Sequence, residues 1–275
     1  MINNYLNKLL NESYSDRVRV SNLFNKNDLG KEPIVFTDVM KTWPSYPKWN
    51  FKYLSDNYGK HQILADRVNE GRHQFIETTF SNFITYMINE EEANPYYGKS
   101  ALHLSNGMKH DYFTGSYFVC WYREWYRERE NEVRKLNMSN LYLGPRNAKS
   151  PLHIDIWGTS FWNALFVGKK LWVFFNPNDE KCLYNGKVDP FDPDLNLYPL
   201  FEGVKPIIHV QQPGELIYCP GNIWHAIYVL EPSLALSENF INEENYLNVL
   251  NTFKEFGYTN AYQKMLAIVD SFKSK

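Results

Sequence analysis

The spacing of hydrophobic positions changes along the chain, and its middle third predicts β-structure. Between residues 140 and 241, short apolar runs alternate with polar positions and are separated by turn residues. We expect eight strands in the runs NLYL, PLHID, SFWNALFV, KLWVFF, PIIHV, ELIYC, HAIYVL and SLALSENFI. Short strands joined by turns in this way predict a β-sandwich or a jelly-roll barrel. The fold class expected is therefore mainly β with flanking helices.

The segments before and after this β region have other patterns. Residues 1–12 and 80–87 place their apolar side chains at helical spacing, whereas PIVFT at 33–37 has the character of a strand. Residues 243–256 and 261–272 predict two closing helices. The first half of the chain is therefore expected to mix helices and strands.

The pattern contains no repeat, low-complexity tract or Pro/Gly/Ser-rich linker. We therefore expect a single domain over residues 1–275. Within it, we expect an α+β decoration over 1–139, a barrel core over 140–241 and C-terminal helices over 242–275.

The run WYREWYRERENEVRKL, which starts at Trp121, also has helical character because charges of both signs alternate along it. Tyr122, Trp125 and Arg129 recur at helical spacing. A solvated helix face with aromatic anchors explains this pattern. A lid that contacts the substrate is the alternative.

The composition indicates which kinds of partner and which cellular compartment to expect. The chain carries 29 Lys and Arg against 31 Asp and Glu, a net charge of -2, which argues against nucleic acid or an anionic membrane as the main partner. Its 3 cysteines are an odd number at wide spacing, which fits neither a disulfide framework nor a zinc site. There is no long apolar run and no signal-peptide pattern at the start. We expect an intracellular, cytoplasmic protein, with the nucleus left open.

A candidate metal site begins with His153 and Asp155 in PLHID. Side chains two apart on a strand leave the same face, so both are expected to reach one point. An imidazole and a carboxylate suit a divalent first-row metal, although a single His-x-Asp motif often arises by chance. His225 follows a sharp turn at Pro220-Gly221 and is the candidate third ligand. His209 in PIIHV competes with it.

Two histidines and one carboxylate occupy one face of an octahedron, which is the arrangement of non-haem Fe(II) oxygenases. The open positions imply a chelating co-substrate and O2. If that co-substrate is 2-oxoglutarate, its far carboxylate needs a cation inside the barrel.

Lys170 is the candidate cation. The segment SFWNALFV-GK-KLWVFF is expected to form a hairpin with a two-residue turn at Gly168-Lys169, which places Val167 opposite Lys170. One face of this hairpin then carries Asn163, Leu165, Val167, Lys170, Trp172 and Phe174. A lone ammonium on a largely apolar face is expected to meet an anion. Snorkelling at a strand end is the alternative.

The run SLALSENF predicts a face of small and polar side chains beside the same site. Ser233, Ala235, Ser237 and Asn239 alternate with larger residues. Asn239 is positioned to orient a ligand, although a solvent-facing polar stripe gives the same pattern.

These residues resemble a known family. HIDIWGTSFWNALFVGKKLWVFF and PGELIYCPGNIWHAIYVLEPSLALSENF resemble the JmjC (Jumonji) Fe(II)/2-oxoglutarate-dependent oxygenases. The small hydroxylases related to the phosphatidylserine-receptor-like Jumonji protein are especially similar. The resemblance covers residues 140–240, and EPIVFTDVMKTWPSYPKWNFKYL is similar to the segment before the barrel in these cupin-like proteins.

The resemblance implies a double-stranded β-helix, in which His153, Asp155 and His225 bind Fe(II) and Lys170 binds 2-oxoglutarate. It adds Ser150, Asn163 and Asn239 as further contacts around the cofactor and the metal. Trp157 and Tyr142 are expected to line the substrate cleft; Trp157 is bulkier than the aliphatic residue expected there in the family.

The family chemistry implied is hydroxylation of a C–H bond by O2, coupled to conversion of 2-oxoglutarate to succinate and CO2. Many family demethylases carry Glu as the second ligand, so Asp155 favours a hydroxylase that acts on a protein or peptide side chain. The alternatives are an N-methyl demethylase, a nucleic-acid hydroxylase and a non-catalytic binding protein of the same fold. The C-terminal helices resemble those through which relatives form homodimers.

Overall fold

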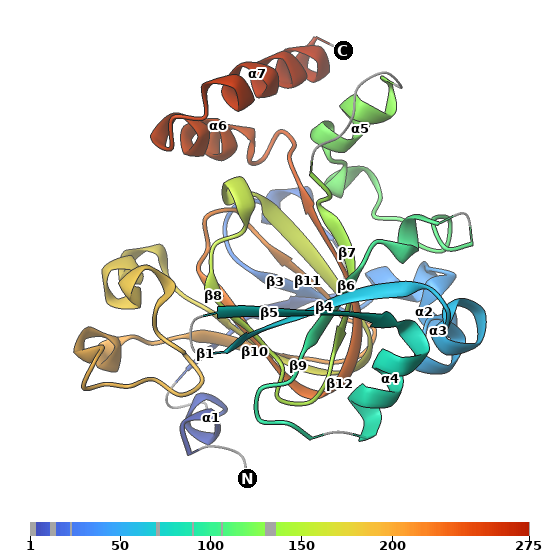
Figure 1. Cartoon of the computed structure of the whole chain (residues 1–275). Coiled ribbons are helices and arrows are strands. Elements are labelled where there is room, and N and C mark those ends of the chain that lie inside the picture. Colours follow the sequence, from blue (N-terminus) through green and yellow to red (C-terminus); the bar gives the residue numbers. More distant parts are fainter. Residues whose placement is uncertain are drawn as a thin grey trace.

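The computed structural model describes residues 4–11, 15–22, 24–69, 72–89, 91–105, 107–129 and 136–274. Six strands form the barrel at its centre (Figure 1). They are β7 (Ser139–Gly144), β8 (Lys149–His153), β9 (Ser160–Phe174), β10 (Ile207–Gln211), β11 (Leu216–Cys219) and β12 (His225–Phe240).

The two long strands β9 and β12 define the topology. They pair antiparallel along their whole length, from Phe174 opposite His225 to Ser160 opposite Phe240. The first half of β9 also pairs with β11 and its second half with β10, whereas β12 pairs first with β8 and then with β7. Each long strand therefore passes from one sheet to the other. This topology is that of a double-stranded β-helix, so the predicted fold class is confirmed.

The predicted hairpin at Gly168-Lys169 is wrong. The chain does not reverse there, because both halves of β9 keep their partners in β12. The strand instead bends: Gly168 has φ +85°, and a Cβ on it would lie 2.1 Å from the carbonyl oxygen of Pro232. The pairing register shifts between Val229 and Ala235, where β12 bends in the same way. The runs HAIYVL and SLALSENFI are accordingly one strand rather than two.

Strands from the first half of the chain extend one barrel sheet on both sides. The order is β2-β3-β11-β9-β12-β7-β6-β4-β5, and β1 pairs with β10. Their bounds are β1 Asp16–Arg17, β2 Arg19–Ser21, β3 Ile34–Phe36, β4 Gln62–Asn69, β5 Arg72–Thr79 and β6 Tyr97–Ser100. Only β3 was predicted; the sequence patterns did not indicate β4, β5 and β6.

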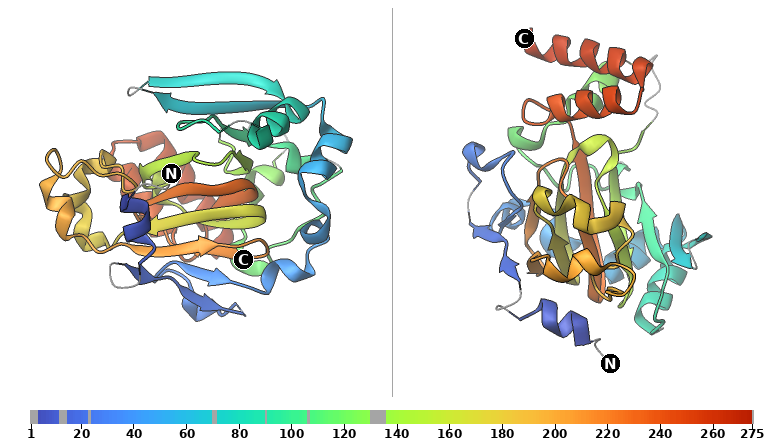
Figure 2. Two further views of the ribbon diagram at one scale, coloured as in Figure 1. Left: turned by 90° about the horizontal axis from the view of Figure 1, so that it is seen from below. Right: turned by 90° about the vertical axis from the view of Figure 1, so that its left-hand side faces the viewer.

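Helices lie around the barrel (Figure 2). Their bounds are α1 Asn4–Leu9, α2 Ser45–Lys48, α3 Phe51–Tyr58, α4 Phe80–Asn89, α5 Trp121–Arg127, α6 Tyr246–Glu255 and α7 Thr259–Lys273. The helices predicted at 80–87, 243–256 and 261–272 are confirmed. The helix predicted from Trp121 is shorter than expected and ends at Arg127; residues 130–135 of that run lie outside the described residues.

The two faces of the sheet that contains β9 have different surroundings. Trp162 and Phe166 join Trp43 and Trp49 in a core that fills the space between the sheet and the N-terminal helices. Side chains of alternate positions point into the barrel, because neighbouring residues on a strand face opposite sides. Within the described part of the chain, no helix combines the length and apolar character needed to cross a bilayer.

Candidate metal centre and cofactor cavity

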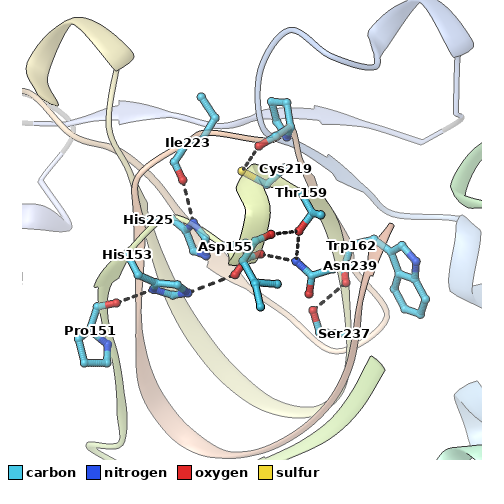
Figure 3. A network of polar contacts seen from close by, with 12 residues as sticks. Pro151, His153, Asp155, Thr159, Trp162, Cys219, Ile223, His225, Ser237 and Asn239 are labelled. Carbon is cyan, nitrogen blue, oxygen red and sulfur yellow. Dashed lines mark hydrogen bonds and ion pairs between the residues drawn. The ribbon is translucent and has the colours of Figure 1, made fainter. Parts of the chain in front are cut away.

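Three predicted side chains meet inside one end of the barrel (Figure 3). His153 ends β8 and His225 begins β12, and the two residues are paired neighbours. Their ring centroids lie 4.3 Å apart. One ligand atom from each of His153, Asp155 and His225 lies within 4.8 Å of the others, so the three could hold one metal ion.

The two histidines present the same nitrogen to this point. His153 Nδ1 lies 2.6 Å from the carbonyl oxygen of Pro151, and His225 Nδ1 lies 3.0 Å from that of Ile223. A carbonyl oxygen only accepts, so each Nδ1 carries the proton. In the neutral form of each ring, the lone pair is then on Nε2. This second hydrogen bond is the one that orients metal-binding histidines.

Asp155 reaches the cluster in a way that differs from the prediction. β8 ends at His153, and Asp155 instead caps a 3-10 turn over Ile156–Gly158, so strand alternation does not place it. Its Oδ1 nevertheless lies 3.4 Å from His153 Nε2. Asn239 Nδ2 donates to Asp155 Oδ2 at 2.8 Å and to Thr159 Oγ1 at 3.0 Å. A residue of β12 therefore holds the carboxylate of Asp155 in place.

The charge states of Asp155 and His225 suit a metal. Burial and the neighbouring His153 lower the pKa of His225 to about 4, so this ring is neutral at neutral pH. Burial alone would raise the pKa of Asp155, but His153, His225 and Asn239 together bring it below its ordinary value. Burial opposes protonation of His153, but Asp155 and the Pro151 carbonyl outweigh it and raise the pKa of this ring above its ordinary value. A metal ion therefore has to displace a proton from His153. A carboxylate and neutral imidazoles are the forms that bind metal ions.

A cavity opens beside the cluster. Its empty volume, including the mouth, is about 390 Å³. It is lined by Tyr97, Tyr142, Ser150, His153, Asp155, Phe161, Asn163, Trp172, His225, Ile227, Ser237 and Asn239. Asn163 and Trp172 share this surface, as predicted for one face of the β9 segment, although β9 bends rather than turning back.

Lys170 is fully buried behind the cavity wall, with 0% of its surface exposed. Its Nζ donates to Tyr97 Oη at 3.0 Å and lies 5.9 Å from the ring centre of Tyr142. In the described part of the chain, no carboxylate forms an ion pair with it. Burial lowers the pKa of Lys170 to about 7. A buried ammonium without a counter-ion is suited to bind an anion, and a snorkelling side chain is excluded by its burial.

The other predicted contacts lie in the cavity wall. Asn163 Oδ1 is buried without a hydrogen-bond partner. Ser150 and Tyr142 also line the cavity, and burial raises the pKa of Tyr142 to about 12, so its hydroxyl stays protonated. The hydroxyls of Ser150 and Tyr142, together with Lys170 and Tyr97, are donors that fit a small carboxylate ligand next to a metal.

Trp157, which is expected from the sequence to line the substrate cleft, and His209, the competing metal ligand, are both absent from the residues that line the cavity. The Trp157 ring packs against Tyr122 at 5.6 Å and Phe253 at 5.1 Å between centroids. His209 lies outside the cluster, with its Nε2 2.7 Å from Glu215 Oε2.

The sequence reasoning missed Tyr97, which contacts Lys170. It lies on β6, in a region where the alternation of apolar and polar residues is too short to predict a strand.

Comparison with known proteins agrees with this geometry. A family model described as a cupin-like domain matches residues 21–246. A lysine-specific demethylase, JMJ21 of Arabidopsis thaliana, is 28% identical over 242 residues, which is 81% of this chain and 24% of that protein. The 2-oxoglutarate and iron-dependent oxygenase JMJD4 of Mus musculus is 25% identical over 79% of this chain and 57% of its own length.

A third relative is the bifunctional arginine demethylase and lysyl-hydroxylase psr-1 of Caenorhabditis briggsae. It is 23% identical over 78% of this chain and 57% of its own length. The chain therefore spans about a quarter of the first relative and just over half of the other two. The resemblance to JmjC oxygenases is confirmed by these matches.

Proposed function

Because the chain belongs to the cupin-like domain family, we propose that it is an Fe(II)- and 2-oxoglutarate-dependent oxygenase that hydroxylates a protein or peptide side chain. The observation that carries this proposal is the cluster of His153, Asp155 and His225 beside a cavity with a buried cation at its back. Neither feature alone selects this chemistry. Together they match an iron centre with a dicarboxylate co-substrate.

In this proposal, His153, Asp155 and His225 would hold Fe(II), and the co-substrate and O2 would supply its remaining ligands. With 2-oxoglutarate and O2 bound, such a centre supplies oxidation of a C–H bond and releases succinate and CO2. The hydrogen bonds to the Pro151 and Ile223 carbonyls keep both imidazoles in one tautomer and orientation. Asn239 keeps the carboxylate of Asp155 turned toward them.

Lys170 binds the far carboxylate of 2-oxoglutarate in this scheme, and Tyr97 keeps the ammonium in place through its hydroxyl. Ser150 and Asn163 supply further polar contacts from the cavity wall, and Tyr142 extends the wall toward the substrate. The Oδ1 of Asn163 is buried without a partner, and because an amide oxygen only accepts, it needs a donor such as a water molecule rather than a carboxylate oxygen.

The relatives' names indicate the substrate class. One is named for arginine demethylation and lysyl hydroxylation, and another for lysine demethylation. We propose a protein substrate, and favour hydroxylation since Asp155 rather than Glu is the second ligand. Peptides rich in Lys, Arg and methyl-Arg are incubated with the protein, Fe(II), ascorbate and 2-oxoglutarate, and their masses are measured.

A gain of one oxygen on a peptide is the expected result. Loss of a methyl group with release of formaldehyde would instead establish a demethylase, and a modified nucleoside would establish a nucleic-acid hydroxylase. No 2-oxoglutarate binding by calorimetry in the presence of Mn(II), with no change in Lys170→Ala, would contradict the proposal and favour a binding protein of this fold.

We also propose that the C-terminal helices form a homodimer. Leu247 on α6 and Phe256 and Tyr258 after it are 58%, 62% and 50% exposed, which leaves apolar surface for a second copy. A light-scattering mass of a single chain would contradict this. All 3 cysteines are free, which agrees with the proposed cytoplasmic location.

A further inference from the structure

The segment between the two halves of the metal centre has an unusual backbone. Trp157 adopts φ +58° and ψ +16°, the left-handed region, which is uncommon for any residue with a side chain and a clear outlier for a bulky one. The other described residues with this conformation outside glycine are three asparagines and Tyr184. Surrounding contacts must therefore hold Trp157 in place.

Two helices supply these contacts. The Trp157 ring forms T-shaped contacts with Tyr122 on α5, at an interplanar angle of 76°, and with Phe253 on α6, at 78°. Tyr122 and Phe253 are 5% and 1% exposed, so both lie in the packed core. The indole is thus clamped between α5 and α6; Figure 1 shows these two helices at its top, beside α7.

The backbone that follows is fixed from the other side. Gly158 also has a positive φ, and a Cβ there would lie 2.1 Å from Asn222 Oδ1. A Cβ on Gly221 would lie 2.1 Å from the Gly158 carbonyl oxygen. The turn at Gly221-Asn222 therefore presses directly on the loop. That turn leads to Ile223, whose carbonyl orients His225.

The same loop carries Asp155. The Gly158 N–H donates to the Asp155 carbonyl at 3.0 Å and closes the turn, and Thr159 at its end accepts from the Asn239 that holds the Asp155 carboxylate. A reversal of φ at Trp157 would send the chain in another direction. The position of the Asp155 carboxylate therefore depends on the indole staying between α5 and α6.

We propose that Trp157 is a positioning residue, which locks the Asp155 loop against α5 and α6 and thereby sets the metal affinity of the His153–Asp155–His225 cluster. In this proposal, Trp157 does not act by lining the substrate cleft. This inference rests on the proposed function only in taking the cluster as a metal site.

The test uses the full chain without metal and Co(II) as the probe. Calorimetry measures the dissociation constant of Co(II), and visible absorption reports the geometry of its ligands. We expect Trp157→Ala to weaken Co(II) binding about tenfold and to change the absorption bands, because groups that orient metal ligands contribute on this order. Trp157→Phe, which keeps an aromatic ring for the clamp, should stay within about threefold of the wild-type protein.

Two more variants separate positioning from general stability. Phe253→Leu alters the clamp from the α6 side without touching the loop's own sequence, and should weaken Co(II) binding about threefold or more. Phe201→Ala removes an equally buried ring that packs on Phe175 in another core cluster. It should lower the melting temperature and leave Co(II) affinity unchanged.

Wild-type affinity and an unchanged spectrum in Trp157→Ala or, should that variant not fold, in Phe253→Leu would overturn the inference while leaving the proposed function intact. A wild-type protein that binds no Co(II) would overturn the metal site itself, and both proposals with it.

Discussion

The hydrogen bond between Asn239 and Asp155 is the contact through which strand β12 positions a proposed metal ligand. Replacing Asn239 with Ala removes the 2.8 Å bond and leaves the Asp155 carboxylate free to rotate away from the imidazoles. We expect Mn(II) binding, measured by calorimetry, to weaken about 10- to 100-fold.

Ser233→Ala is the matched control, because Ser233 is a buried polar residue of the same strand whose hydroxyl bonds the Gly144 carbonyl away from the cluster. Its Mn(II) affinity should equal that of the wild-type protein. Equal affinities in both variants would show that Asn239 does not orient the carboxylate.

The protonation of Lys170 predicts how 2-oxoglutarate binding depends on pH. The pKa of Lys170 is about 7 in the folded chain, so the ammonium is lost as the pH rises through 7. Since only the ammonium attracts a carboxylate, binding above this pH takes up a proton. The dissociation constant in the presence of Mn(II) should therefore rise with pH above 7, by at most about tenfold per pH unit.

The same group affects stability. In the unfolded chain Lys170 has its ordinary, higher pKa, so the unfolded state binds the extra proton between about pH 7 and pH 10. Lys170 therefore destabilises the fold below pH 7, and this cost decreases as the pH rises above 7. Lys170→Met should bind 2-oxoglutarate weakly at every pH, whereas Lys169→Met should retain the wild-type profile.

Lys169 is a suitable control because it is adjacent in sequence but pairs with Glu231 at 2.7 Å on the surface. A flat binding profile in the wild-type protein, or a profile abolished by Lys169→Met, would contradict the assignment of Lys170.

At the level of single residues, much of the site could be predicted because its residue types have characteristic chemistry. Imidazole and carboxylate at short spacing and a lone lysine in an apolar run are visible in the sequence. His153 and His225 lie together as predicted, and Lys170 is buried, although it lies on a bent strand and not beside the predicted hairpin turn. Asp155 lies beside the two histidines as predicted, but the structural reason differs. The turn after β8, and not the face of a strand, points its side chain toward them. The position of Tyr97 beside Lys170 depends on pairing between strands that are far apart in the sequence. It could therefore not be predicted from the residues around Tyr97.

At the level of secondary-structure elements, the bend of β9 at Gly168 allows this one strand to belong to both sheets of the barrel. Gly168→Ala places a Cβ 2.1 Å from the Pro232 carbonyl oxygen in a backbone conformation that side chains rarely adopt. We expect the free energy of unfolding to fall by about 2 kcal/mol or more, measured by urea denaturation.

Gly203→Ala provides the comparison, because Gly203 has no positive φ and no atom within 4 Å of an added Cβ. That variant should stay within about 0.5 kcal/mol of the wild-type protein. A Gly168→Ala variant of equal stability would mean that the bend does not require glycine.

The same position shows what the sequence could not reveal about the elements. Strand character along 160–174 and 225–241 was evident from apolar alternation, but Gly-Lys between two apolar runs fits a hairpin and a bent strand equally well. The pairing partner decides between them, and pairing is non-local. Helices with a clear apolar face, such as α4, α6 and α7, needed no such information.

For the molecule as a whole, a buried ion pair ties α5 to the barrel. Arg123 on α5 contacts Glu238 on β12 at 2.8 Å, and Tyr112 and Ser139 donate to the same carboxylate. Arg123→Met leaves the charge of Glu238, which is 1% exposed, without its cation. We expect the free energy of unfolding to fall by about 3–5 kcal/mol in urea denaturation.

Lys52→Met is the control, since Lys52 and its partner Asp56 are 83% and 56% exposed on α3. Its effect should stay below about 0.5 kcal/mol. Adding Glu238→Gln to Arg123→Met should recover part of the loss, because the buried charge is then removed as well. No recovery would mean that the packing of Arg123, rather than its charge, holds α5.

The proposed activity would require the metal cluster, the cavity and Lys170 at once, and release of succinate would report on all three. The purified protein with Fe(II), ascorbate and 2-oxoglutarate should form succinate, and His153→Ala or Asp155→Ala should reduce its formation to the background without protein. Succinate formation at the wild-type rate in these variants, or none in the wild-type protein, would contradict an iron- and 2-oxoglutarate-dependent oxygenase.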